Sequence, residues 1–331
     1  MSQITHELLF TDKDGEKRVD ITPAVGEISW RSHIDELGVE LNFNMAVNDI
    51  RPFPRNPVDI GGLVQLINYK TEQEVFQGIV FTEERNDTSP INYKVFDIMF
   101  YLNKSEEIIQ FNDIPVDQAV AKLLDRFNIP YAPIPSMPVR VDKVYNEVVS
   151  DILRDLIYLH ERDSGQKMII EAREGRVVIE KEDENKKIRP KYQVAGNLNE
   201  VYLNDVLMNP SRSRSIEEMK NVVIITHDEE ILHEERNESL INQYGMLQYV
   251  ENIDEEDKAR ARNAARNRLR DMSKIMEDVN VTLMGNDDVR AGRIIEIEEP
   301  FTGISGEYRI ISADHTLSNG FHTVNVKLEA V

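Results

Sequence analysis

The sequence predicts a mainly β protein with an α+β insertion. The expected architecture has two antiparallel β-barrels, a helix-helix-hairpin module inserted between them, and a long helix in the second barrel. Three patterns predict this class. Apolar and polar residues alternate with a period of two towards both ends of the chain, which is typical of half-buried strands. Apolar residues at helical spacing fill the middle, and another helical pattern precedes the last strands.

These patterns divide the 331 residues into three expected domains. The first barrel spans residues 1–103, the inserted α+β module spans residues 104–197, and the second barrel with its long helix spans residues 198–331. A chain of this length can bury a sizeable core and can hold two or three domains. Two all-β segments of similar size therefore flank a mixed module.

The first barrel is expected to contain several strands, at residues 7–10, 17–21, 37–45, 63–69, 75–83 and 91–102. Residues 75–81 and 93–100 are apolar on both faces of their strands. Burial of both faces is typical of a barrel strand with a second layer outside it. We therefore expect the first barrel to be covered by another domain or by a neighbouring subunit.

The middle segment predicts two helices and a hairpin. The first helix opens near Ile114, and its apolar residues recur at helical spacing: Val116, Val120, Leu123 and Leu124. A second apolar pattern predicts a helix over residues 145–162. Strands over residues 168–172 and 177–180, joined by a turn at residues 174–175, form the hairpin.

The last segment predicts a short strand over residues 221–226 and three C-terminal strands between residues 289 and 328. Apolar residues in the outer two of these three alternate with polar ones: Ile295, Ile297, Val324, Val326 and Leu328. Gly303 and the pair Asn319-Gly320 supply the tight turns, because glycine and asparagine accept positive φ.

A helix expected over residues 255–276 carries two distinct sets of residues. The apolar face should pack inward and consists of Ala261, Ala265, Leu269, Met272 and Met276. The basic stripe repeats every four residues and consists of Lys258, Arg262, Arg266, Arg270 and Lys274. We hypothesise that the basic stripe is a subunit interface that contacts an acidic surface. A solvated face paired with nearby acids is the alternative. Nucleic-acid binding is disfavoured, because no aromatic residues interleave with the basic ones.

Composition excludes several kinds of function. Asp and Glu total 60 against 39 Lys and Arg, a net charge of -21, so specific nucleic-acid binding is not expected. There is no cysteine, which excludes disulfides, thiolate metal sites and cysteine nucleophiles. The sequence contains no apolar run of about 18 residues, so no membrane partner is expected. The first residues do not resemble a signal peptide.

No residue is predicted to be catalytic, to bind a cofactor or to hold a metal. His227 and His233 stand among acidic residues, but their spacing of six is not the spacing of four that places two ligands on one helical face. We therefore interpret the segment that contains these two histidines as a solvated acidic loop. His315 follows Asp314, and we expect it to make a structural hydrogen bond, because no nucleophile elbow accompanies the pair. One enzymatic alternative stays open, a cell-wall hydrolase that uses carboxylates, although the carboxylates are too many to identify a pair.

The C-terminal strands also carry a resemblance to a known family. The resemblance depends on short motifs that follow one another in a fixed order, and the matching residues are Ala291, Gly292, Ile295, Ile297, Gly306, Tyr308, Ile310, Asp314, His315, Val324, Val326 and Leu328. This set resembles the C-terminal barrel of phage baseplate hub proteins, above all the hub of PBSX-like prophages and R-type bacteriocins. Late control protein D and the base of type VI secretion spikes are more distant relatives. Residues 239–247 resemble a further stretch of the family, with Leu240 in place of isoleucine.

The resemblance implies a structural hub of a contractile phage tail or tail-like bacteriocin, with barrels of the tail-tube type and no cofactor. It implies a homotrimer that connects the sixfold tail tube to the threefold spike and lines the central channel. Three chains with two barrels each would present six barrels. The implied partners are the tail tube protein, the spike protein, other baseplate proteins, and the tape measure protein in the lumen.

The resemblance also implies a location, which is the bacterial cytoplasm during assembly and then the baseplate of the particle. Some relatives carry a wall-degrading domain after the barrel. The sequence stops at Val331, directly after the last strand, so we expect no such domain here.

Overall fold

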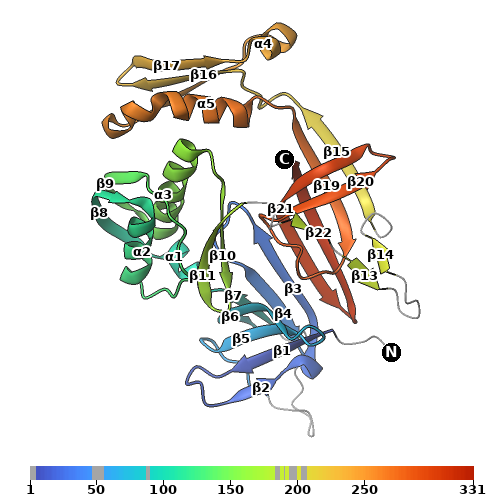
Figure 1. The fold of residues 1–331 in the computed structure, drawn as a ribbon. Helices are drawn as coiled ribbons and strands as arrows, with labels where there is room; N and C mark the ends of the chain where they lie inside the picture. The colour runs from blue at the N-terminus through green and yellow to red at the C-terminus, as the bar shows by residue number, and fades with distance from the viewer. Residues whose placement is uncertain are drawn as a thin grey trace.

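The computed structural model describes residues 5–46, 56–86, 90–182, 187–189, 191–193, 200–202 and 207–331. It is mainly β, with 51% strand and 20% helix, as predicted. Figure 1 shows strands from the N-terminal third below, a mixed α/β module to one side, a small sheet with a long helix above that module, and C-terminal strands opposite. The expected domain junction at residues 197–198 lies outside the described residues. Within the described ranges, no helix has both the length and the apolar character needed to cross a membrane.

The first strand unit consists of β1–β7 and is antiparallel. Its strands are β1 (His6–Thr11), β2 (Arg18–Asp20), β3 (Val25–His33), β4 (Glu40–Met45), β5 (Leu63–Asn68), β6 (Gln73–Glu84) and β7 (Ile91–Phe96), with the 3-10 turn η1 (Thr22–Ala24) before β3. Leu8, Leu41 and Tyr93 point into one core. Strand β3 was not predicted. The end of the predicted strand 91–102 is wrong, because α1 (Phe100–Lys104) forms there instead.

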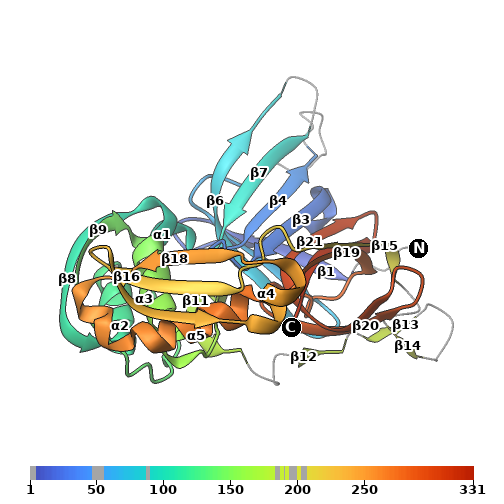
Figure 2. The same ribbon diagram turned by 90° about the horizontal axis from the view of Figure 1, so that it is seen from above.

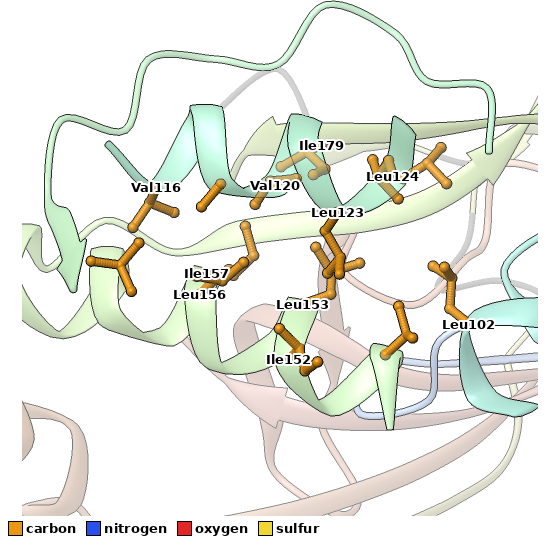
Figure 3. Close-up of a cluster of buried hydrophobic side chains, with 14 of the residues drawn as sticks. Leu102, Val116, Val120, Leu123, Leu124, Ile152, Leu153, Leu156, Ile157 and Ile179 are labelled. Atoms are coloured by element: carbon orange, nitrogen blue, oxygen red, sulfur yellow. The ribbon is translucent and has the colours of Figure 1, made fainter. Parts of the chain in front are cut away.

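The mixed module follows the predicted order of helix, helix and hairpin. Its elements are β8 (Glu106–Pro115), α2 (Val116–Arg126), β9 (Arg140–Val148), α3 (Val149–Ser164), β10 (Met168–Arg173) and β11 (Arg176–Lys181). Side chains from α2 and α3 point towards each other in its core, Leu123 beside Leu153 among them (Figure 3). The ladder of β8 with β9 was not predicted, and it places the first turn of the second predicted helix in a strand.

The last strand unit consists of β15 and β19–β22. Its strands are β15 (Met208–Ser215), β19 (Met276–Met284), β20 (Ile294–Glu299), β21 (Ile304–Ser318) and β22 (Phe321–Ala330). Three short strands precede it, β12 (Lys187–Ile188), β13 (Lys191–Gln193) and β14 (Glu200–Tyr202). The predicted hairpin turn is confirmed, since Asn319 and Gly320 have φ values of 52° and 77°. The three predicted C-terminal strands are confirmed as β20, β21 and β22.

The two strand units form one open sheet, so two closed barrels are not found among the described residues. The sheet runs in the order β15-β19-β22-β21-β3-β4-β7-β6-β5-β1-β2; β20 branches from β21, and β12 pairs with β20. The junction is the antiparallel ladder of β3 with β21, in which Trp30 faces His315. This ladder joins two segments of the chain that the sequence analysis had placed in separate barrels.

The helix-sheet unit lies beside the mixed module rather than inside the last strand unit. It consists of β16 (Val222–His227), β17 (Glu230–Arg236), α4 (Glu238–Tyr244), β18 (Gln248–Asn252), the 3-10 segment η4 (Glu255–Arg260) and α5 (Ala261–Met272). Helix α5 lies between this three-stranded sheet and α3 (Figures 1 and 2). The prediction of a long helix in the second barrel is therefore wrong, because the apolar strand β16 gives the helix its own packing surface.

The predicted double-sided burial of β6 and β7 is found only in part. Val80 and Val95 are fully buried in the core of the first strand unit. On the other face, Phe81 and Phe96 are half-buried and pack with Phe100 of α1. The second layer is thus an aromatic cluster from the chain itself, and it leaves part of its surface open.

Candidate functional site

The inner face of α5 is built by small residues that let the helix approach the sheet. Ala261, Ala265 and Leu269, three of the predicted apolar residues, are buried against β16. Met272 is half-buried at the helix end. The prediction that Met276 packs on this face is wrong, because Met276 lies in β19 with 39% of its surface exposed.

The basic stripe is shorter than predicted. Arg262, Arg266 and Arg270 are exposed along α5, as their spacing of four predicts. Lys258 stands in η4 and forms an ion pair with Glu255, with Nζ and Oε2 2.6 Å apart. Lys274 lies beyond the helix end. The predicted helix over residues 255–276 is interrupted at both ends, so only the three arginines share one helical face.

The members of the stripe differ in their partners. Arg270 donates to the Gly165 carbonyl oxygen at 3.4 Å and lies 3.5 Å from an oxygen of Asp271. Arg262 and Arg266 have no hydrogen-bond or ion-pair partner within the described part of the chain. An exposed cation without a local partner is available to an acidic surface, whereas a paired one must first exchange its partner. Arg262 and Arg266 are therefore the strongest candidates for contact.

A polar network on another side of α5 was missed by the sequence analysis. Arg268 donates to Glu251 at 3.0 Å and to the Tyr158 hydroxyl at 2.6 Å, and its guanidinium lies over the rings of Tyr158 and Tyr249. Burial, then the Glu251 carboxylate, raises the pKa of Tyr158, so the hydroxyl stays protonated. Arg162 of α3 pairs with Asp257 of η4. These contacts hold the helix-sheet unit against α3.

A cleft of about 1220 Å³ lies among the first strand unit, the β10–β11 hairpin and the loop before β20. Arg293 pairs with Glu171 at 2.7 Å, and Arg309 donates to Glu182 at 2.6 Å. Burial acts to raise the pKa of Glu171, but Arg293 and then Arg173 outweigh it and lower that pKa. The Glu171 carboxylate is thus held charged. Glu161 on the same cleft differs, because burial raises its pKa.

His227 in β16 and His233 in β17 lie on paired strands, and neither belongs to a group of possible metal ligands within the described residues. His227 Nδ1 donates to the Ile253 carbonyl oxygen at 2.8 Å, and its Nε2 lies 2.8 Å from Oε2 of Glu255. His233 contacts Glu235 at 3.1 Å. Asp314 turns away from His315 and lies 3.4 Å from Arg31, because neighbouring residues of a strand point to opposite faces. The Asp-His motif is therefore not a catalytic pair.

His315 belongs to a buried cluster at the junction of the two strand units. Its Nε2 donates to the Val289 carbonyl oxygen at 2.8 Å, and its Nδ1 lies 3.0 Å from Nε2 of His322. Burial, then His322, lowers the pKa of His315 to about 3, and burial lowers the pKa of His322 to about 4. Both rings are therefore neutral at pH 7. Trp30 stacks on His315 with ring centroids 4.4 Å apart.

Asp287 completes this cluster and connects it to the N-terminal strands. His6 of β1 lies 3.0 Å from Asp287 Oδ1, and Asn68 of β5 donates to Oδ2 at 2.6 Å. Burial acts to raise the pKa of Asp287, but the hydrogen bond and charge of His6 outweigh it, and that pKa falls to about 2. The sequence analysis found no sign of this cluster, because its members come from opposite ends of the chain.

A comparison with known families identifies the chain. The family model described as YQBQ-like matches residues 28–329. The chain belongs to the YQBQ-like family. A curated relative, the phage-like element PBSX protein XkdQ of Bacillus subtilis (strain 168), is 20% identical over 265 residues, which cover 77% of each protein. The predicted resemblance to PBSX-type phage proteins is confirmed.

Solved structures with this fold are also phage-related. A tail protein from Neisseria meningitidis MC58 has a TM-score of 0.70 at 13% identity, covering 99% of this chain and 97% of its own. A component of the Escherichia coli type VI secretion system, described as structurally similar to tail proteins of bacteriophage T4, has a TM-score of 0.51 at 12% identity. That match covers 93% of this chain and 74% of its own. At these identities the likeness shows a shared fold.

Proposed function

We propose that this chain is the structural hub of the baseplate of a contractile phage tail or tail-like bacteriocin. In this proposal it connects the sixfold tail tube to the threefold spike and lines the central channel. Family membership and the fold shared with tail proteins support it. Its partners would be a tail tube protein, a spike protein and other baseplate proteins, with a tape measure protein in the lumen. It would assemble in the bacterial cytoplasm and then belong to the particle.

The observation that carries this proposal is the open sheet with two strand units. In the described part of the chain the sheet ends at β2 on one side and at β15 on the other. Unpaired sheet edges are usually covered in native proteins. A homotrimer would present six strand units in one ring, and edge-to-edge contacts around a closed ring leave no edge exposed. The domain divisions 1–103, 104–197 and 198–331 would then correspond to two ring-forming parts and one peripheral part.

The outer aromatic cluster of the first strand unit supports a neighbour on that face. Phe96 and Phe100 stack with centroids 3.8 Å apart, and Phe81 meets both edge-on. Tyr101 joins the cluster and keeps 43% of its surface exposed. Aromatic residues are enriched where protein surfaces meet. This cluster is where we propose that a neighbouring subunit docks.

The basic stripe supports a second contact. The chain has a net charge of -21, so copies of it repel each other unless a local basic surface meets acid. Arg262 and Arg266 provide such a surface, since nothing in the described ranges pairs with them. We propose that Lys258, Arg262, Arg266, Arg270 and Lys274 form a subunit interface. The same net charge would let DNA pass along a channel lined by this chain without binding to it.

A wall hydrolase is the alternative function, and Glu161 is the residue that would act as its acid. A glycosidase needs one carboxyl group with a raised pKa beside a second carboxylate, and burial gives Glu161 the first property. In our proposal Glu161 instead accepts the Met168 N–H at 2.6 Å and fixes the entry to β10. Zymography with peptidoglycan should therefore show no clearing. A clearing band that Glu161→Gln abolishes would replace the structural proposal with the hydrolase.

Labelling of intact particles tests the position of the chain. Antibodies against the purified chain should mark a single end of the tail in electron micrographs of particles with accessible baseplates. Antibodies against the tail tube protein, applied to tubes stripped of their sheath, provide the matched control and should mark the length of the tube. Labelling along the whole tail, or no chain in purified particles by mass spectrometry, would contradict a hub position.

A further inference from the structure

The buried cluster at the strand-unit junction has the composition of a metal site. Two imidazoles and one carboxylate, from His6, His322 and Asp287, have ligand atoms that all lie within 4.8 Å of one another. His6 Nε2 is 3.0 Å and His322 Nδ1 is 4.0 Å from Asp287 Oδ1. The three residues come from β1, from β22 and from the loop between β19 and β20. No other such group of three occurs in the described part of the chain.

The hydrogen bonds fix which atom of His322 faces the carboxylate. The Val289 carbonyl oxygen can only accept, so His315 Nε2 carries a proton and donates to it. In a neutral ring the other nitrogen then accepts, so His322 Nε2 must donate to His315 Nδ1. With Nε2 as the donor, Nδ1 is the nitrogen that a neutral His322 turns as a lone pair towards Asp287, 4.0 Å from Oδ1.

Two acceptors that face each other in a buried place repel unless a cation lies between them. The side chain of His322 is 11% exposed, that of Asp287 is 13% exposed, and that of His6 is 2% exposed. The hydrogen bond of His6 with Asp287 satisfies one edge of the carboxylate, but it leaves Nδ1 of His322 without a donor. A bound divalent cation would satisfy all three groups at once.

The surrounding hydrogen bonds match those that orient metal ligands. A metal-binding histidine usually donates its other ring N–H to a neighbouring group, which fixes its orientation. His322 donates its other N–H to His315, and Nδ1 of His6 lies 2.9 Å from Oγ1 of Thr5, which can accept. Asn68 Oδ1 accepts the Lys70 N–H at 3.0 Å, so its amide nitrogen must be the group that holds Asp287.

We propose that His6, Asp287 and His322 bind one divalent transition metal ion of the Zn²⁺ type, and that this ion fastens the N-terminal strand to the last strand unit. Two imidazoles and one carboxylate suit Zn²⁺, at bond lengths of about 2.0–2.2 Å. The ligand atoms now lie within 4.8 Å of one another, and those of a tetrahedral Zn²⁺ lie roughly 3.3 Å apart, so closing the cluster around an ion requires shifts of at most about 1.5 Å. The proposal concerns the isolated chain and does not depend on the hub function.

The chain offers a direct probe of this site. Trp30 is its single tryptophan, and its ring centroid lies 5.1 Å from that of His322. Co²⁺ bound at the cluster should quench Trp30 fluorescence, saturate at one equivalent and be displaced by Zn²⁺. Calorimetric titration of untagged, chelator-treated protein with Zn²⁺ should give the same stoichiometry. A ligand that binds only the folded state also raises Tm, here by roughly 5 °C at about 100 times Kd.

Variants then locate the site. His322→Asn should weaken Zn²⁺ binding by about 100-fold or more, because loss of a ligand costs more than loss of an orienting group. His233→Asn is the matched control, since His233 contacts Glu235 in the helix-sheet unit and should leave the affinity unchanged. If His322→Asn does not fold, the quenching titration of the wild-type protein still tests whether one ion binds beside Trp30. Absence of saturable Co²⁺ quenching, or equal loss of affinity in His233→Asn, would overturn the proposal.

Discussion

The two junctions of this molecule are built from different interactions. The strand junction joins β3 to β21 through a backbone ladder, with Trp30 and His315 buried beside it and the His322 side chain 11% exposed. The helix junction joins α5 to α3 through side chains, with Arg268 shared between Tyr158 and a carboxylate. A ladder of backbone hydrogen bonds fixes register and angle, whereas long side chains can adjust. The comparison indicates that the sheet is the rigid frame and that the helix-sheet unit is held by contacts sensitive to salt.

The largest expected effect comes from removing the aromatic ring of the strand junction. Trp30 is 4% exposed and stacks on His315. Trp30→Ala should lower the free energy of unfolding by about 3–5 kcal/mol, because it leaves a large cavity. Urea unfolding followed by circular dichroism measures this loss. Trp30→Phe is the control and should lose clearly less; equal losses would mean that ring burial does not stabilise the junction.

A smaller loss is expected from crowding the same junction. A Cβ atom built on Gly285 would lie 1.8 Å from Cγ of His322, so any side chain there must displace the ring. Gly285→Ala should lower the free energy of unfolding by about 1–3 kcal/mol. Gly15→Ala is the comparison without crowding: it would meet no neighbour within 4 Å, and its cost comes from a φ of 75°, a strain that Gly285 does not have. If Gly285→Ala and the wild type bind Zn²⁺ with equal affinity, His322 is not a ligand of the proposed ion.

The helix junction should respond less, and its response should depend on salt. The Arg268 side chain is 31% exposed, so its contacts are partly screened by water. Arg268→Ala should lower the free energy of unfolding by about 1–2 kcal/mol in dilute buffer. In about 1 M salt, where the Debye length is about 3 Å, this difference should shrink. A salt-independent loss, like that of Trp30→Ala, would remove the contrast between the junctions.

The smallest effect on the fold is expected from the basic stripe. Arg262→Glu/Arg266→Glu should change the free energy of unfolding by less than about 0.5 kcal/mol per site, since both residues are exposed. At an interface with acid the same reversal costs several kcal/mol, so particle assembly should fail. Lys13→Glu/Lys70→Glu reverses two exposed charges elsewhere and should assemble normally. Normal assembly of the arginine variant would make the stripe a solvated face.

Local patterns of the sequence predicted what local contacts decide. The period of two in β22 and the turn at Asn319 and Gly320 appear in the structure because each depends on neighbours along the chain. The spacing of four on α5 likewise predicted its three exposed arginines. The predicted ends of this helix were wrong, because residues 255–260 form η4 and the strand β19 begins at residue 276, shortly after α5 ends at residue 272.

What the sequence did not reveal depends on partners far along the chain. Strand β3 was overlooked, although Ile28 and Trp30 alternate with Ser29 and Arg31, because a bulge near Val25 interrupts the pattern. This strand joins the two units, so missing it led to the prediction of two separate barrels. His6 and Asp287 are 281 positions apart, and no local spacing connects them. Gly285, which leaves room for the His322 ring, is a local sign that could have drawn attention to the loop.

The copy number of the chain in the intact particle tests the central claim most directly. A cryo-electron microscopy reconstruction of the baseplate, computed without imposed symmetry, should contain three copies in one ring. Each copy should contribute both strand units, so that six similar units surround an open channel between tube and spike. Six copies in the ring, or one strand unit per chain facing the channel, would contradict the proposal that this chain adapts sixfold to threefold symmetry.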